Sequence, residues 1–256
     1  MKKLKIMSFN MRTQVEHDGV NQFRMRKDRI MDMLDREDAD IIGFQEVTDE
    51  MRHWLREALG GKYTVVGCGR MSDYTGEAVA IALRNGLFEL VALTPFWLSD
   101  TPEIPGSRYE NAEQSKWPRM SLSALVKCTE IEKPFYFINT HLDHLGKRAR
   151  YLGMEQTAKY IAELGLKFIY TGDMNAYPDT EEILVFNEIL GDRGSKDATA
   201  ELGGTFHDFG RRENKVKIDY IFTDGEYSNA YIVADDGKDG LYYSDHHAVC
   251  ADIELG

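Results

Sequence analysis

Cysteine is scarce in this sequence, and its three copies lie far apart. Cys68, Cys128 and Cys250 form neither a disulfide framework nor the close pairs that bind zinc. This excludes a small disulfide-stapled secreted scaffold and a cysteine-type zinc module. We expect each cysteine to lie in or beside a strand as a small apolar residue.

Long apolar runs are also absent. No segment approaches the roughly 20 consecutive apolar residues that a membrane-spanning helix requires. The first residues, Met1-Lys2-Lys3, lead directly into a strand-like pattern without the apolar core of a signal peptide. We therefore expect a cytoplasmic protein that has no membrane partner.

Positive charge is in deficit, because 31 lysines and arginines face 43 acidic residues and the net charge is −12. A chain of this balance lacks the basic surface needed for generic binding to duplex nucleic acid. Nucleic acid stays possible as a partner, because carboxylates gathered around divalent cations are locally neutralised. The balance favours a small or local phosphate-ester substrate.

Apolar residues make up 43% of the 256 residues, which is enough for a substantial core. We find no repeat, low-complexity tract or linker, so the sequence predicts one domain over residues 1–256. The least regular stretch, Pro95–Pro118, contains four prolines. Such a long loop could border a substrate site or simply pack on the surface.

Strands and helices alternate in part of the chain, and strands follow one another elsewhere. Strands are predicted at Leu4–Asn10, Ala39–Phe44, Tyr63–Val66, Ala78–Leu83, Leu87–Leu93, Met120–Val126, Phe135–Thr140, Leu166–Tyr170, Lys217–Thr223, Asn229–Ala234 and Ala248–Ile253. Helical spacing appears over residues 23–34, 51–59, 151–161 and 180–190. These elements predict an α/β fold with two mixed β-sheets packed face to face and helices outside.

The turn Thr171-Gly172-Asp173-Met174-Asn175 follows an apolar strand and precedes a helix, where Asp179 and Glu182 predict a capping box. Asp173 could hold a cation or orient a water. Asn175 could do the same or bond a phosphate oxygen. Alone, Gly-Asp-x-Asn is also common in ordinary turns.

Other strand ends carry similar polar residues, which are Asn10, Glu46, His141, Asp245 and His246. Asp219 lies early in a strand between Ile218 and Tyr220, where a buried carboxylate needs a partner such as His246. Oxygen-rich groups of this kind suit Mg²⁺ or Mn²⁺. Together with histidines, they indicate hydrolysis of phosphate esters.

The order of these motifs resembles the endonuclease/exonuclease/phosphatase superfamily, which has the DNase I-like fold. The matching segments are Met7-Ser8-Phe9-Asn10, Gln45-Glu46-Val47, Asn139-Thr140-His141-Leu142-Asp143-His144, Gly172-Asp173-Met174-Asn175, Ile218-Asp219-Tyr220-Ile221-Phe222 and Ser244-Asp245-His246. The resemblance implies a four-layer sandwich with the active site at one end.

The resemblance also implies a role for each matching residue. Glu46 would be the principal metal ligand, with Asn10 beside it and Asp245 on the metal side. Asp173 would activate the attacking water, and Asn175 would bind the phosphate. Asp219 would pair with His246, which would contact the scissile phosphate. His141 would act as an acid or bind the phosphate.

The substrate is less well defined by the sequence. Arg119 and Arg150 could clamp a phosphate, and Tyr177 could stack against a base or a sugar. His207 lies in Thr205-Phe206-His207-Asp208-Phe209, which looks like a stretch of the deadenylase-like branch and suggests a substrate-binding role. A nuclease acting on single-stranded RNA or DNA is therefore one alternative. A non-catalytic binding module and a hydrolase of other esters are the remaining ones.

Overall fold

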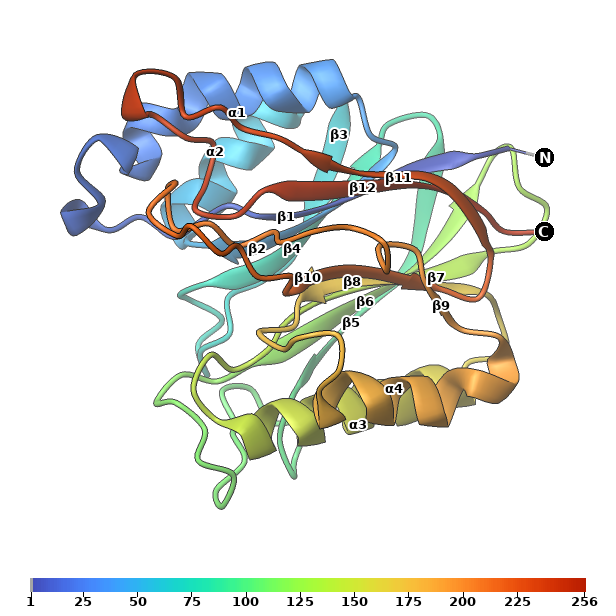
Figure 1. Ribbon diagram of the computed structural model, residues 1–256. Coiled ribbons are helices and arrows are strands. Elements are labelled where there is room, and N and C mark those ends of the chain that lie inside the picture. The colour runs from blue at the N-terminus through green and yellow to red at the C-terminus, as the bar shows by residue number, and fades with distance from the viewer. Residues whose placement is uncertain (1) are drawn as a thin grey trace.

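Two six-stranded β-sheets face each other, and helices cover the outer surface of each sheet (Figure 1). The structure is a computed structural model and describes residues 2–256. This arrangement confirms the predicted four-layer sandwich of mixed sheets and helices. None of the helices in residues 2–256 has the length and apolar character needed to cross a membrane.

The first sheet has the strand order β11-β12-β1-β2-β4-β3. Its strands are β1 (Leu4–Asn10), β2 (Ile41–Val47), β3 (Tyr63–Val66), β4 (Ala78–Arg84), β11 (Glu226–Val233) and β12 (Ala248–Glu254). Helices α1 (Phe23–Glu37) and α2 (Asp49–Leu59) pack on its outer face. Strand β1 pairs in parallel with β2 and antiparallel with β12, so the sheet is mixed.

The second sheet has the order β5-β6-β7-β8-β10-β9. Its strands are β5 (Phe88–Trp97), β6 (Met120–Cys128), β7 (Phe135–His141), β8 (Phe168–Asp173), β9 (Lys196–Asp197) and β10 (Asp219–Thr223). Helices α3 (Lys147–Glu163) and α4 (Glu181–Leu190) pack on its outer face. Strands β7 and β8 are parallel, whereas β8 and β10 are antiparallel. Within residues 2–256 there are also three short 3₁₀ segments, at Glu16–Asn21, Gly191–Arg193 and Lys238–Gly240.

The continuous apolar runs of the central strands follow from this layering. In β2, Ile41 packs between the two sheets, while Ile42 and Phe44 pack beneath the helices. In β8, Ile169 faces the other sheet and Tyr170 faces α3 and α4. Both faces of these strands are therefore buried, so both must be apolar.

Asn139 makes a polar connection between the two sheets. Its Nδ2 donates to the carbonyl oxygens of Phe44 and Ala80, at 2.9 and 3.0 Å. Its Oδ1 accepts from Gln45 Nε2 at 2.7 Å and from Thr171 Oγ1 at 3.1 Å. A buried hydrogen-bond network of this kind helps to fix the offset of one sheet on the other.

Strand β5 continues beyond its predicted end at Leu93 and passes through Pro95 to Trp97. Proline is tolerated there because β5 is an edge strand, where one side of the backbone pairs with no neighbour. The irregular stretch therefore begins at Leu98, after the strand. Strand β10 is shorter than predicted and begins at Asp219, so this carboxylate lies at the strand terminus.

The predicted capping box at the start of α4 is wrong. The N-cap residue is Thr180, and no side chain caps the helix. Glu182 is buried and accepts a hydrogen bond from Arg150 Nε at 3.2 Å instead of returning to the helix end. Arg150 on α3 thus binds the carboxylate that was predicted to cap the helix.

Strand polarity brings the polar residues to one end of the molecule. Strands β1 and β2 are parallel neighbours in the first sheet, and β7 and β8 are parallel neighbours in the second. The carboxyl ends of all four strands carry Asn10, Glu46, His141 and Asp173. Because the sheets are stacked, these four side chains meet across the interface between them.

Candidate active site

A cavity of about 780 Å³ opens at this end of the sandwich. Residues from both sheets and from their connecting loops line it, and cationic side chains are frequent among them. Its lining consists of Arg12, Thr13, Glu46, Arg70, Glu77, Trp117, Arg119, His141, His144, Leu145, Lys147, Arg150, Asp173, Asn175, Ala176, Tyr177, Thr180, Glu182, Phe206, Arg212, Val216, Ile218, Asp245 and His246. Lysine and arginine side chains thus gather beside carboxylates in this cavity, in a protein whose net charge is −12.

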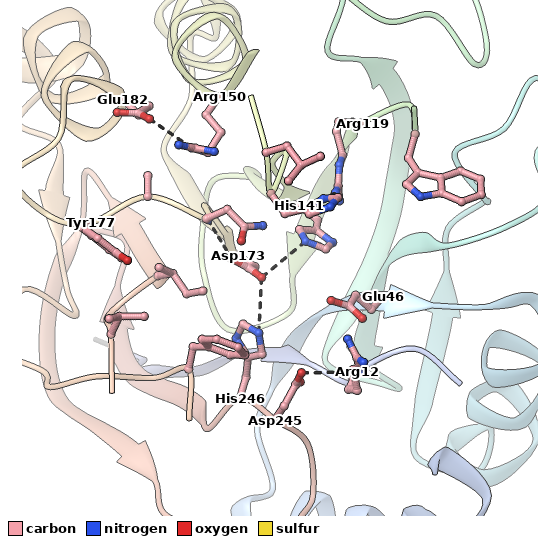
Figure 2. Close-up of a pocket in the computed structure, with 18 of the residues that line it drawn as sticks. Arg12, Glu46, Arg119, His141, Arg150, Asp173, Tyr177, Glu182, Asp245 and His246 are labelled. Atoms are coloured by element: carbon pink, nitrogen blue, oxygen red, sulfur yellow. Dashed lines mark hydrogen bonds and ion pairs between the residues drawn. The ribbon is translucent and has the colours of Figure 1, made fainter. Parts of the chain in front are cut away.

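Asp173 lies at the centre of the site, with a histidine on either side (Figure 2). It is the last residue of β8 and stands opposite His141 of β7 and Asp219 of β10. Its Oδ2 lies 3.5 Å from His141 Nε2 and 3.8 Å from His246 Nε2. Its Oδ1 accepts from the backbone N–H of Asn175 at 2.9 Å, which holds the carboxylate in place.

The predicted contact between Asp219 and His246 is present, with Oδ2 and Nδ1 2.9 Å apart. Thr205 Oγ1 donates to the same carboxylate oxygen at 2.5 Å. Asp219 is fully buried and does not line the cavity, whereas His246 does. The carboxylate therefore orients the imidazole so that Nε2 is turned toward Asp173 and the cavity.

The net effect of burial and neighbouring charges is to raise the pKa values of both Asp173 and His246, but to different values. Burial, and then repulsion from Asp219, raise the pKa of Asp173 to about 7. For His246, burial lowers the pKa, but attraction from Asp219 and Asp173 outweighs it and raises the value to about 10. Near neutral pH, Asp173 can thus accept a proton while His246 is an imidazolium.

His141 is a neutral imidazole in this environment. Burial holds its pKa well below the usual value, and the nearby guanidinium groups of Arg119 and Arg70 lower it further. A neutral imidazole can donate one N–H to a phosphate oxygen but is a poor source of a proton. Of the two roles that the resemblance implies, phosphate binding therefore fits His141 better.

Glu46 is presented by a distortion of β2. The pairing of β2 with β4 shifts register between Phe44 and Val47, and Glu46 has a φ of 59°. A bulge of this kind redirects a side chain at a strand end. Its carboxylate accepts from Thr13 N at 2.8 Å and from Asn10 Nδ2 at 3.1 Å. Despite burial, these donors and Arg12 keep its pKa below the usual value.

Asn10 lies between the carboxylates of Glu46 and Asp173. Its Oδ1 accepts from the backbone N–H of Arg12 at 2.9 Å. Its Nδ2 donates both to Glu46 and to Asp173 Oδ2, the latter at 3.0 Å. Asn10 thus fixes the spacing of the two carboxylates, and its oxygen is already engaged by the backbone.

The donor set suits a divalent cation. Asp173, Asp219 and His246 form a buried group that could hold a metal ion, with one ligand atom of each within 4.8 Å of the others. The carboxylates of Glu46 and Asp245 line the adjoining part of the cavity, with Arg12 Nε 3.6 Å from Asp245 Oδ2. Carboxylate oxygens in this number are typical of sites for hard cations rather than of thiolate zinc sites.

The predicted substrate-binding residues do not all reach the cavity. Arg119, Arg150 and Tyr177 line it, as does Asn175. His207 does not: it is buried against His247, with ring centroids 4.1 Å apart, and its Nδ1 accepts from Gly210 N at 3.0 Å. We therefore correct the assignment of His207 to a structural position behind the site.

Several charged residues of the cavity were not identified by the sequence analysis, and Arg12, Arg70 and Glu77 are among them. Arg12 follows Asn10 by two residues, and that proximity to a strand end is the only local signal for it. Arg70 and Glu77 lie in an irregular loop and pair at 2.9 Å. Trp97 Nε1 donates to the carbonyl oxygen of Arg70 at 2.6 Å, so a long-range contact places this loop at the cavity.

The fold and the site define a hydrolase of phosphate esters. The endonuclease/exonuclease/phosphatase family model matches residues 7–246, and the chain belongs to this family.

Solved structures of similar proteins agree with this membership. An endonuclease/exonuclease/phosphatase from Bacteroides vulgatus is 28% identical, with a TM-score of 0.91 and full coverage of both chains. A mannosyl-6-phosphatase of Bacteroides thetaiotaomicron is 27% identical, with a TM-score of 0.83 over 98% of this chain and 99% of the other. The human nocturnin catalytic domain, at 18% identity and a TM-score of 0.73 over 99% and 94% of the chains, shares the fold. Among curated proteins, none matches by sequence.

Proposed function

We propose that this protein hydrolyses phosphate esters of small molecules with the help of Mg²⁺ or Mn²⁺. The observation that carries the proposal is the position of Asp173, whose carboxylate oxygen lies between His141 and His246 at the base of a cation-lined cavity. A base, two imidazoles and surrounding guanidinium groups are groups that phosphate hydrolysis can use for proton transfer and for stabilising negative charge.

Asp173 accepts the proton of the attacking water, because its raised pKa keeps it basic enough to do so near neutral pH. His246, as an imidazolium held by Asp219, binds a non-bridging phosphate oxygen and stabilises charge that develops on it. His141 and Asn175 donate further hydrogen bonds from the second sheet and its turn. Asn10 keeps Asp173 and Glu46 at a fixed separation.

Glu46 and Asp245 are the residues that we propose to hold the metal, beside Asp173. A bound divalent ion would supply Lewis-acid polarisation of the phosphate at this position. The buried Asp173, Asp219 and His246 group is less suited to a hard cation, because a hydrogen bond already joins Asp219 to the histidine.

A small substrate fits the cavity better than a polymer. About 780 Å³ is within the size range of small-molecule sites. Buried Arg119, which is 4% exposed, lies within the cavity rather than on an open track along the surface. The phosphatase activity named for the Bacteroides thetaiotaomicron protein supports action on phosphate monoesters. A nuclease and a non-catalytic binding module remain the competing functions.

A metal-supplemented substrate panel tests the proposal. The purified protein is incubated with phosphate monoesters, bis-p-nitrophenyl phosphate and oligonucleotides, with Mg²⁺, with Mn²⁺ or with chelator. We expect metal-dependent phosphate release from small esters. Cleavage of oligonucleotides alone would favour the nuclease, and absence of any metal-dependent hydrolysis would favour the binding module.

A further inference from the structure

Glu182 is a buried carboxylate in the cavity wall that the proposed chemistry does not use. It is 1% exposed, and its Oε1 accepts from Arg150 Nε at 3.2 Å. Its Oε2 has no hydrogen-bond partner within residues 2–256, although the residue lines the cavity. A buried carboxylate oxygen without a donor is unfavourable, so a ligand that donates a hydrogen bond would stabilise it.

Arg150 is held beside this carboxylate in a fixed orientation. Its Nη1 donates to the carbonyl oxygen of Asp143 at 3.1 Å while its Nε is bound to Glu182. Figure 2 shows this pair and Tyr177 on the opposite side of Asp173 from Glu46. The proposed metal ligands and this pair thus lie on opposite walls of the cavity.

Tyr177 adds an exposed aromatic surface to the same wall. Its side chain is 49% exposed and lines the cavity beside Ala176. Ile218, another lining residue, is tied to this turn because its carbonyl oxygen accepts from Met174 N at 2.8 Å. The wall therefore combines an apolar surface with a carboxylate–guanidinium pair.

We propose, on the basis of the proposed function, that this wall binds a sugar or a cyclic polyol as the group esterified to the phosphate. Such a ring has an apolar C–H face for Tyr177 and several hydroxyl groups that donate to Glu182 or accept from Arg150. A second phosphate is disfavoured here, because Glu182 would repel it. A nucleobase would use the aromatic surface but supplies fewer donors for the carboxylate.

Phosphate esters that differ in their ring and in their hydroxyl groups test this inference. Hexose 6-phosphates are compared with cyclohexylmethyl phosphate, which has a ring but no hydroxyls, with ethyl phosphate and with nucleoside monophosphates. We expect the wild-type protein to prefer hexose phosphates. Glu182→Gln should lower the ratio of kcat/KM for hexose 6-phosphate over cyclohexylmethyl phosphate by about 10-fold or more, the effect expected for lost hydrogen bonds to a charged group.

Two further variants complete the design. Tyr177→Ala, at an exposed position where misfolding is not expected, should lower kcat/KM for both ring-bearing substrates relative to ethyl phosphate. Asp224→Asn is the matched control, because Asp224 is a similarly buried carboxylate paired with Arg193 at 3.1 Å and does not line this cavity. It should leave both ratios unchanged.

The outcomes separate this inference from the proposed function. Equal wild-type rates on hexose and cyclohexylmethyl phosphates, a preference for nucleotides, or an unchanged ratio in Glu182→Gln would overturn the sugar assignment and leave phosphate-ester hydrolysis intact. Failure to hydrolyse any of the phosphate esters with either metal would overturn both.

Discussion

Asp219 Oδ2 lies 2.9 Å from His246 Nδ1 in the buried interface between the two sheets. The pair connects β10 of the second sheet with the segment that enters β12 of the first. Asp219 raises the pKa of His246 by attraction and that of Asp173 by repulsion. One buried carboxylate thus influences both titrating groups of the site.

This relationship predicts the pH dependence of the Asp219→Asn variant. In the wild type, kcat/KM should rise through about pH 7 as Asp173 loses its proton and fall near pH 10 as His246 loses its own. Removing the Asp219 charge relieves repulsion on Asp173 and weakens attraction on His246. Both limbs of the profile should therefore move to lower pH. Limbs that stay in place would contradict these assignments.

Asp173→Asn should abolish most activity while preserving the fold. The amide keeps the shape of the side chain but cannot accept the proton of the attacking water. We expect kcat to fall by about two to four orders of magnitude, the usual contribution of a general base. Circular dichroism and thermal unfolding should show a folded protein, because removing a buried, partly protonated carboxyl does not open a cavity. A variant with near-normal kcat would exclude Asp173 as the base.

Glu46→Gln should raise the metal concentration needed for half-maximal activity. Loss of one carboxylate ligand weakens binding of a hard cation, and we expect a shift of about 10- to 100-fold, comparable to that seen for disturbed metal sites. Glu77→Gln removes a different cavity carboxylate, the one paired with Arg70, and serves as the control for general loss of negative charge. An equal shift in both variants would contradict Glu46 as the principal ligand.

Gly43→Ala should destabilise the contact between the sheets. A Cβ atom at Gly43 would lie 2.4 Å from Thr171 Oγ1 and 2.8 Å from Asn139 Oδ1, within the polar network below the site. We expect the free energy of unfolding to fall by about 1–3 kcal/mol in a denaturant titration. Gly61→Ala is the control, because in the described residues no atom beyond Gly61 and its chain neighbours lies within 4 Å of the added Cβ. Similar stability of both variants would argue against close packing at Gly43.

Much of the fold and of the site's central residues could be predicted, because the signals are local. Apolar runs indicated β1, β2, β7 and β8, and polar residues at their ends indicated a shared site. Asn10, Glu46, His141 and Asp173 do lie together. The order of the motifs along the chain resembles that of the family. Separately, parallel strands place their carboxyl ends at the same edge of a sheet, which indicates a shared site. The precise role of each residue stays a prediction.

Local patterns failed where a distant contact outweighs them. Glu182 has the spacing of a capping residue, but Arg150 on another helix binds it. His207 lies in a motif that resembles a substrate-binding stretch, but it stacks on His247 behind the cavity. The irregular stretch was predicted to begin at Pro95, yet β5 continues through this residue to Trp97, because an edge strand tolerates proline.

The sequence by itself determined the family, the layered α/β architecture and the chemistry of the strand ends. Only the tertiary structure decided much of the cavity wall, because Arg70 and Glu182 are brought there by a loop and a helix that have no periodic signal for the site. Periodicity records which face of an element is buried, whereas the packing of separate elements sets which charged groups meet.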